Sequence, residues 1–299
     1  MSVGISLSSS LSLWDSSFPP SFSVSFKKIG AFGQGILQTG SDVNRKDLCG
    51  SFRRRRTTRT SAIMATGKIE EALPLELDFT SEPLQVFDGT TRLYISYTCP
   101  YAQRVWIARN YKGLQEKIKL VPIDLKNRPP WYKEKVYAAN KVPALEHDNR
   151  VIGESLDLIK YIDTHFEGPS LAPDGPEKEE LADELLSYTG SFYKAVTSTF
   201  KGEGSDDADA AFDYVEKALS GFEEGPFFLG QFSLVDVAYV PFIERFHLFS
   251  KDVMNVDITS QRPNLALWIQ EMNKIEAYAQ TRQDPRELVE RYKNRFLAT

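Results

Sequence analysis

The residue with the clearest chemical potential in this sequence is Cys99, within the stretch Tyr-Ile-Ser-Tyr-Thr-Cys-Pro-Tyr-Ala that spans 94–102. A cysteine there is either a reactive thiol or a small residue that fills a strand-to-helix turn. Pro100 is tolerated in a helix only within the first turn, so Cys99 is expected at or next to the N-cap. The free backbone amides and the helix dipole at that position favour a thiolate.

The helix dipole alone is too weak to ionise Cys99 at neutral pH. It contributes roughly 0.3–1 kcal/mol, whereas one pKa unit corresponds to about 1.36 kcal/mol. A thiol whose pKa starts at about 8.5 therefore also needs hydrogen bonds. Residue 102 is alanine, so a Cys-x-x-Cys pair is absent, and an external thiol must resolve any mixed disulfide formed at Cys99.

Two further residue pairs indicate a place for a ligand beside such a thiol. Val142-Pro143 stands at the start of an expected strand, directly after a loop. Glu154-Ser155 opens an expected helix and offers a carboxylate, a hydroxyl and free amides to a charged ligand end. A ligand with an ammonium and a carboxylate at one end and a thiol in its middle fits these features, and glutathione is such a ligand.

The elements expected around these residues follow the order of a thioredoxin-like domain, βαβ followed by ββα. In that kind of domain the proline that matches Pro143 is cis and exposes the backbone of the preceding residue to an extended ligand. The expected elements are a strand over 92–96, a helix over 102–109, a strand over 117–123, a loop over 127–131, short strands over 141–146 and 151–152, and a helix after Ser155.

Beyond residue 166 the pattern changes to helix alone. The segment 166–176 contains two glycines and three prolines and is expected to be a linker. Ser233 and Asp236 form a capping box, with Phe232 and Val237 as its hydrophobic staple, which we interpret as a folding signal and not as a site. The helix-periodic runs are 177–200, 206–222, 234–249, 263–278 and 286–296. The predicted fold is an α/β thioredoxin-like domain followed by an all-α domain.

The first 62 residues differ in composition from the rest. They hold fourteen serines, nine Lys or Arg and three acids, which is typical of an organellar transit peptide and favours the chloroplast. Arg53–Arg56 could alternatively form a nucleic-acid or nuclear-import patch. The predicted organisation is a transit peptide over 1–62, a flexible segment over 63–79, a thioredoxin-like domain over 80–165, a linker over 166–176 and a helical domain over 177–299.

Composition excludes several classes of function. Without the leader, 27 basic and 38 acidic residues remain, a net charge of −11 that disfavours binding to nucleic acid. Cys49 lies in the leader, so the remainder has one cysteine and no internal disulfide. No apolar run approaches the roughly 18 residues of a membrane span. The scattered His147, His165 and His247 predict no metal site.

Four motifs together resemble the cysteine-type glutathione transferases, and most closely their plant lambda class, with the omega and dehydroascorbate-reductase classes next. The resemblance covers the chain from about residue 80 onward, including the helical domain with its Ser-x-x-Asp box. Tyr101 stands where relatives often have Phe. The motifs are Cys-Pro-Tyr-Ala at 99–102, Leu-Lys-Asn-Arg-Pro-Pro-Trp at 125–131, Lys-Val-Pro-Ala-Leu at 141–145 and Gly-Glu-Ser at 153–155.

The resemblance implies a role for each candidate site residue. Cys99 would be the catalytic thiol, and Arg128 would lie near the glycyl carboxylate of glutathione. The Val142 backbone, before cis Pro143, would pair with the cysteinyl group. Glu154 and Ser155 would hold the γ-glutamyl end.

A cysteine in place of a catalytic Ser or Tyr implies thiol transfer and removal of glutathione from adducts, with little conjugation. Glutathione would be a cosubstrate, with no resident cofactor, and the acceptor a small aromatic, flavonoid-like or glutathionylated molecule. We expect a monomer in the chloroplast stroma, bound to neither membrane nor nucleic acid.

Three alternatives remain open at this point. A carrier with the same fold would bind aromatic ligands without turnover, in a cleft lined by aromatics whose helical spacing also fits core positions. A dehydroascorbate reductase would use the same thiol on another acceptor. A monothiol glutaredoxin-like module is disfavoured by the long helical domain. The candidate cleft aromatics are Phe192, Tyr193, Phe200, Phe246 and Phe249.

Overall fold

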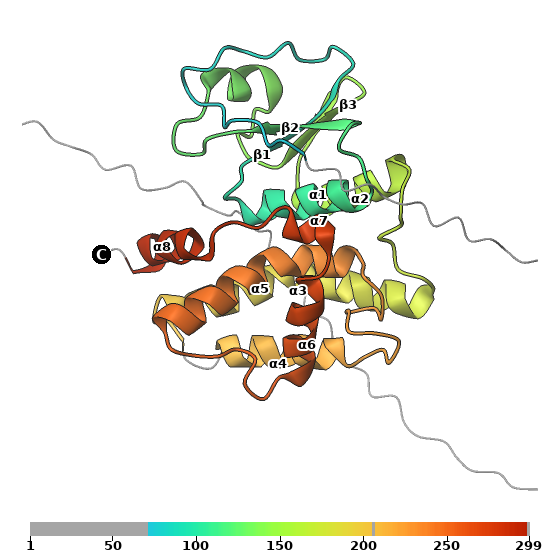
Figure 1. Cartoon of the computed structure of the whole chain (residues 1–299), viewed down its shortest axis with the longest axis vertical. Coiled ribbons are helices and arrows are strands. Elements are labelled where there is room, and N and C mark those ends of the chain that lie inside the picture. The colour runs from blue at the N-terminus through green and yellow to red at the C-terminus, as the bar shows by residue number, and fades with distance from the viewer. Residues whose placement is uncertain (1–70, 205–206, 298–299) are drawn as a thin grey trace, which may run out of the picture. The chain divides into compact units, whose positions relative to one another are not determined.

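A computed structural model of the chain describes residues 71–204 and 207–297. The predicted leader over 1–62 lies outside the described residues. Those that are described form an α/β half followed by a helical half, which confirms the predicted fold class (Figure 1).

The α/β half is built on a four-stranded sheet with the strand order β2-β1-β3-β4. β1 runs parallel to β2 and antiparallel to β3, and Tyr94 of β1 pairs with Val121 on one side and Ala144 on the other. The predicted order of strands and helices is therefore confirmed. The strands are β1 (Thr91–Ile95), β2 (Ile118–Pro122), β3 (Ala144–His147) and β4 (Arg150–Ile152).

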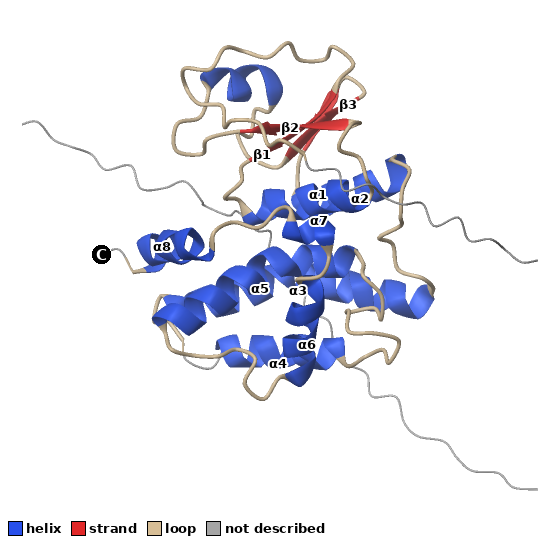
Figure 2. Ribbon diagram, in the orientation of Figure 1, coloured by secondary structure: helices blue, strands red, loops and turns tan. Residues whose placement is uncertain are grey.

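Two α-helices, α1 (Pro100–Tyr111) and α2 (Ser155–His165), lie between this sheet and the helical half (Figures 1 and 2). A single turn of π-helix, η1 (Tyr132–Val136), belongs to the segment between β2 and β3. Within α1 every residue except Tyr101 and Tyr111 is buried. A helix enclosed on all sides has no solvent face for its polar residues, so each of them needs a partner inside the protein.

In the helical half, α5 packs against α1 and also contacts α3 and α8 (Figure 1). The prediction of a single helix over 263–278 is wrong, because this segment forms two helices, α6 and α7. Its first part ends in i→i−3 hydrogen bonds at Lys274 and Ile275, and Ile275 is extended. The helices are α3 (Pro176–Phe200), α4 (Asp207–Leu219), α5 (Leu234–Val253), α6 (Pro263–Met272), α7 (Glu276–Ala279) and α8 (Pro285–Phe296).

The capping box at the start of α5 is confirmed, and it extends further than predicted. Asp236 accepts from the Ser233 amide at 2.9 Å, and also from Nε1 of Trp268 at 2.7 Å and the Phe228 amide at 3.3 Å. Burial raises the pKa of Asp236 to about 6 despite these bonds. The Asp236 carboxylate therefore joins the start of α5 to α6 and to the loop that precedes α5.

The segment 71–79 departs from the predicted flexible stretch over 63–79. Leu77 bridges Ile123 beside β2, and the Tyr97 hydroxyl donates to the Pro74 carbonyl at 2.6 Å. Glu71 forms a bidentate ion pair with the buried Arg109 of α1, with both bonds at 2.6 Å. These bonds attach 71–79 to the α/β half, whereas 63–70 lie outside the described residues.

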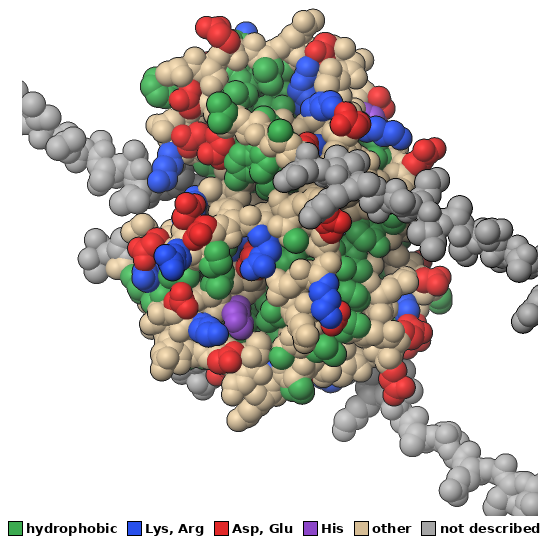
Figure 3. All heavy atoms as spheres, viewed as in Figure 1, with side chains coloured by type: hydrophobic (Ala, Val, Ile, Leu, Met, Phe, Trp, Pro, Cys, Tyr) green, Lys and Arg blue, Asp and Glu red, His purple; other side chains and the backbone are tan. Residues whose placement is uncertain are grey.

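Charge on the face drawn in Figure 3 is mixed. Acidic and basic side chains alternate across this face without one dominant basic patch. In the part of the chain that the structure describes, no helix is long and apolar enough to cross a membrane.

We predict that Asp236→Ala lowers the free energy of unfolding by about 3 kcal/mol or more, because several buried donors lose their acceptor at about 1–3 kcal/mol each. Ser233→Ala, the matched control, removes only the N-cap hydroxyl and should cost about 1 kcal/mol. Denaturant unfolding measures both. Equal losses in the two variants would show that the bonds from Trp268 and Phe228 contribute nothing.

Candidate functional site

Cys99 is the N-cap residue of α1, as the sequence predicts. Its backbone is extended, with φ −88° and ψ 118°, and Pro100 follows as the first helical residue. The Cys99 carbonyl accepts from the Gln103 amide at 3.0 Å, which closes the first helical turn. The side chain is only 1% exposed. The Cys-Pro pair therefore places a buried sulfur at the N-terminal end of the enclosed helix.

The Val142-Pro143 pair lies directly against this sulfur. The peptide bond between the two residues is cis, as predicted. Pairing of β3 with β1 brings the residues before Ala144 beside the end of β1, where the Cys99 turn begins. As a result, the Cys99 thiol donates to the Val142 carbonyl over 3.8 Å, although 43 residues separate them in the sequence.

Arg128 is tied to the segment that leads into Val142. Its Nη1 donates to the Asn140 carbonyl, and the Tyr132 hydroxyl donates to the neighbouring Lys141 carbonyl at 2.7 Å. The Nε atom of Arg128 is buried and has no hydrogen-bond partner among the described residues. The loop that carries Arg128 and the strand entry at Val142 are thus held together at two points.

Glu154 and Ser155 begin α2, and their environments differ. Glu154 has a φ of 65° and is exposed, whereas Ser155 is buried. The Ser155 hydroxyl accepts a hydrogen bond from Nη1 of Arg104 at 3.1 Å. Arg104 belongs to α1, so this bond links the start of α2 to the helix that begins at Cys99.

Arg104 is a site residue that the sequence analysis missed. It also donates from Nε to the Ala238 carbonyl of α5 at 2.8 Å, and its guanidinium lies 4.6 Å from the ring centre of Phe242. Desolvation lowers its pKa to about 10. The sequence did hold a signal that Arg104 is buried. The segment 102–109 contains so many apolar residues that an enclosed helix, together with its arginines, could have been expected.

The electrostatics of Cys99 differ from the expectation based on the helix terminus. Burial is the largest influence and raises the pKa of the thiol. The backbone amides of Ala102 and Tyr101, followed by the charges of Arg245 and Arg104, act in the opposite direction. Because the pKa stays raised, the thiol form dominates at neutral pH in this conformation, and the thiolate fraction increases as the pH rises.

Tyr137 covers the backbone at the start of α2. A methyl group built on Gly153 would lie 2.6 Å from Cζ of Tyr137 and closer still to its hydroxyl. Desolvation raises the pKa of Tyr137, and the nearby charge of Glu154 raises it further. Gly153 is therefore needed for close packing, and Tyr137 is a second neighbour of the candidate ligand residues that the sequence did not indicate.

The candidate cleft aromatics divide into two groups. Phe192, Phe200, Phe246 and Phe249 are buried in the core, as their helical spacing indicated. Tyr193 is only half-buried, and its ring centre lies 6.5 Å from that of Tyr101, two residues after Cys99.

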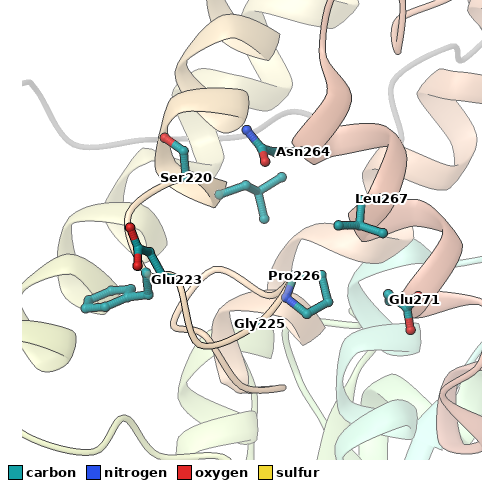
Figure 4. Close-up of a pocket in the computed structure, with 9 residues that line it drawn as sticks. Ser220, Glu223, Gly225, Pro226, Asn264, Leu267 and Glu271 are labelled. Atoms are coloured by element: carbon teal, nitrogen blue, oxygen red, sulfur yellow. The ribbon is translucent and has the colours of Figure 1, made fainter.

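The structure has a separate pocket of about 500 Å³ in the helical half (Figure 4). Its wall includes Leu219 of α4, Leu267 of α6 and, from the loop before α5, Pro226. None of the six predicted site residues lines it. Among the described residues, no group of three or more His, Cys, Asp or Glu side chains could hold a metal ion.

Comparison with known proteins matches both halves of the chain. The family model described as "Glutathione S-transferase, N-terminal domain" matches residues 93–170, and "Glutathione S-transferase, C-terminal domain" matches 201–271. Arabidopsis thaliana "Glutathione S-transferase L2, chloroplastic" is 75% identical over 81% of this chain and 82% of its own length. "Glutathione S-transferase L3" of the same plant is 60% identical over 76% and 97%. The crystal structure of glutathione transferase Omega 2C from Trametes versicolor has a TM-score of 0.59 and 25% identity, covering 70% of this chain and 99% of its own.

We predict that Gly153→Ala lowers the free energy of unfolding by about 1–3 kcal/mol, because the new methyl group overlaps Tyr137. Its backbone is not left-handed, so the contact alone carries the penalty. In a Tyr137→Ala background the same substitution should cost almost nothing, a coupling that a double-mutant cycle of denaturant unfolding measures. Equal penalties in both backgrounds would rule out the Tyr137 contact as the cause.

Proposed function

The chain belongs to the glutathione S-transferase family, and from that premise we propose that it is a thiol transferase that works through a mixed disulfide at Cys99. The observation that carries this proposal is the position of the sulfur. Cys99 caps α1 and lies 3.8 Å from the carbonyl that precedes cis Pro143. A thiol at this place forms a covalent bond to sulfur, whereas a hydroxyl would only donate a hydrogen bond.

Glutathione is proposed to bind across the residues that surround Cys99. The Val142 carbonyl, which accepts from the thiol in this structure, would accept the cysteinyl N–H of glutathione instead. Glu154 and Ser155 would hold the γ-glutamyl end, and the free amides at the start of α2 suit its carboxylate. Arg128 would pair with the glycyl carboxylate, which the unpartnered Nε supports.

The proposed cycle has two exchange steps. The Cys99 thiolate first attacks the glutathionyl sulfur of a mixed disulfide, a Cys99–glutathione disulfide forms, and the acceptor leaves as a thiolate. A second glutathione thiolate then attacks the glutathionyl sulfur, and oxidised glutathione leaves while Cys99 regains its thiolate. For a thioether adduct, the first step breaks the bond between the glutathionyl sulfur and the acceptor carbon. That carbon leaves with the electron pair of the bond and takes up a proton from water.

The acceptor is proposed to be a small aromatic, flavonoid-like adduct. Tyr101 supports this assignment, because its ring packs against Tyr193 and, at 5.1 Å between ring centres, against Phe242. These side chains come from both halves of the protein and surround the residue two positions after Cys99. Flat aromatic molecules pack well against such rings.

We propose that the protein needs no resident cofactor, with glutathione as cosubstrate, and that it acts as a monomer. The "chloroplastic" relative and the Ser-rich leader support delivery to the chloroplast, and we place the enzyme in the stroma.

One observation favours a second candidate, a carrier of aromatic ligands without turnover. Cys99 is buried and its pKa is raised, which disfavours a free nucleophile in this conformation. A dehydroascorbate reductase would use the same thiol and differ only in its acceptor.

We predict that Cys99→Ser lowers hydroxyethyl-disulfide reductase turnover by on the order of 100-fold or more, because the bond-forming sulfur is lost. Calorimetric titration should show that glutathione still binds. Cys49→Ser is the matched control and should keep full turnover. Retention of most of the turnover in Cys99→Ser would contradict the thiol mechanism and leave the carrier as the better account.

A further inference from the structure

Arg245 of α5 is a buried arginine whose guanidinium is only partly paired. Its side chain is 1% exposed. Nη1 donates to Oε1 of Gln103 at 2.7 Å and to the Pro241 carbonyl at 2.6 Å. Nε and Nη2 are buried and have no hydrogen-bond partner among the described residues. Buried donors are almost always paired, so a cation with two unpaired nitrogens indicates a function beyond packing.

The bond to Gln103 places this cation on the side of α1 that carries Cys99. Gln103 follows Cys99 by four residues, and such residues lie on the same face of a helix. The Gln103 amide group is fixed, because its Nε2 donates to Oγ1 of Thr281 at 3.1 Å while its Oε1 accepts from Arg245. Arg245 therefore reaches from α5 to the face of α1 that carries Cys99, about one helical turn from it.

Arg245 keeps a net positive field despite an acidic neighbour. Oε2 of Glu244 lies 3.8 Å from its Nη1, but Oε1 of Glu244 accepts from Nε of Arg282 at 2.8 Å. One carboxylate is thus shared by two guanidinium groups. The other titratable groups that interact with Arg245 are Cys99, Tyr278 and Tyr292. Burial raises the pKa of each of them, and the charge of Arg245 acts in the opposite direction.

The groups that interact electrostatically with the Cys99 thiol are phenols and cations. No carboxylate of the described residues is among the main causes of its pKa shift. The cations are Arg245 and Arg104. Of the two, Arg104 already donates to Ser155 and Ala238, whereas two donors of Arg245 have no partner in the part of the chain that the structure describes. The titratable groups facing the thiol are Tyr101, Tyr132, Tyr193, Arg104 and Arg245.

We propose that Arg245 is a positioning residue that stabilises the Cys99 thiolate through its place on α5, against α1. It would act both before the thiolate attacks the substrate and when Cys99 leaves its mixed disulfide. In the second step the glutathione thiolate bonds to the glutathionyl sulfur, the bond to Cys99 breaks, and its electron pair goes to Sγ. The new negative charge forms in a water-poor site, where a fixed positive charge is most effective. The inference rests on the proposed function, since it concerns the same thiol.

The test is the pH dependence of Cys99 alkylation by iodoacetamide in the full chain, followed by mass spectrometry of the Cys99 peptide. Arg245→Gln should raise the midpoint by about one pH unit, so that alkylation below the midpoint slows about tenfold. Arg245→Lys retains the charge and should stay within a few tenths of a unit of the parent. Equal midpoints in the parent and the Gln variant would overturn the proposal.

Arg262→Met is the control for lost packing. Arg262 is a buried arginine of the helical half, paired with Asp209 and Asp213, and it is not among the charges that act on Cys99. The variant should lose stability and leave the midpoint unchanged. A shift equal to that of Arg245→Gln would mean that any destabilisation moves the midpoint, and would overturn the proposal.

If Arg245→Gln does not fold, the alkylation midpoint of Glu244→Gln tests the proposal in its place. Glu244→Gln removes the carboxylate that partly neutralises Arg245 and keeps an oxygen for Arg282, so the midpoint should fall, and an unchanged midpoint would contradict the proposal. Alkylation requires no turnover. The proposed function fails if Cys99→Ser keeps its turnover, and the role of Arg245 fails if the midpoints coincide, so the two failures are distinguishable.

Discussion

Helix α1 is buried along almost its whole length, and this burial decides how the neighbouring elements are attached to it. A helix without a solvent face must pair each of its polar side chains inside the protein. Arg109 binds Glu71 of the N-terminal segment, and Asn110 binds Gln280 after α7. Arg104 binds Ser155 and α5, while Gln103 binds Thr281 and Arg245. These four residues fix the segment 71–79, α2, α5 and the segment after α7 around the helix that starts at Cys99.

The same enclosure has opposite effects on the chemistry of Cys99. Burial removes water from the sulfur and raises its pKa. It also brings two guanidinium groups and the first amides of α1 into a low-dielectric setting, where their attraction for a thiolate is stronger than in water. The site therefore holds a neutral thiol beside groups that favour its ionised form, and a ligand that takes the Val142 carbonyl would remove one bond that holds the proton.

Local rules were sufficient to predict the parts of the site that depend on proline and on helix caps. Pro100 restricts the backbone in any context, so the N-cap position followed from the sequence, and so did the Ser233 capping box. The cis bond before Pro143 followed only from the resemblance to thioredoxin-like domains, since most bonds before proline are trans. Bonds between residues far apart in the chain could not be predicted this way. Arg104 with Ser155, and Tyr137 over Gly153, depend on how whole elements pack, as does the burial that raises the pKa of Cys99.

Intact-mass analysis after exposure to oxidised glutathione shows whether Cys99 forms the proposed mixed disulfide with glutathione. We expect one adduct of about 305 Da in the parent chain, absent from Cys99→Ser and reversed by reduced glutathione. Because Cys49 is still present in the Cys99→Ser variant, an adduct at that residue would persist there. An unmodified parent chain would rule out the mixed disulfide at Cys99. A parent with a single adduct that Cys99→Ser fully retains would do so too, because the modified residue would then be Cys49.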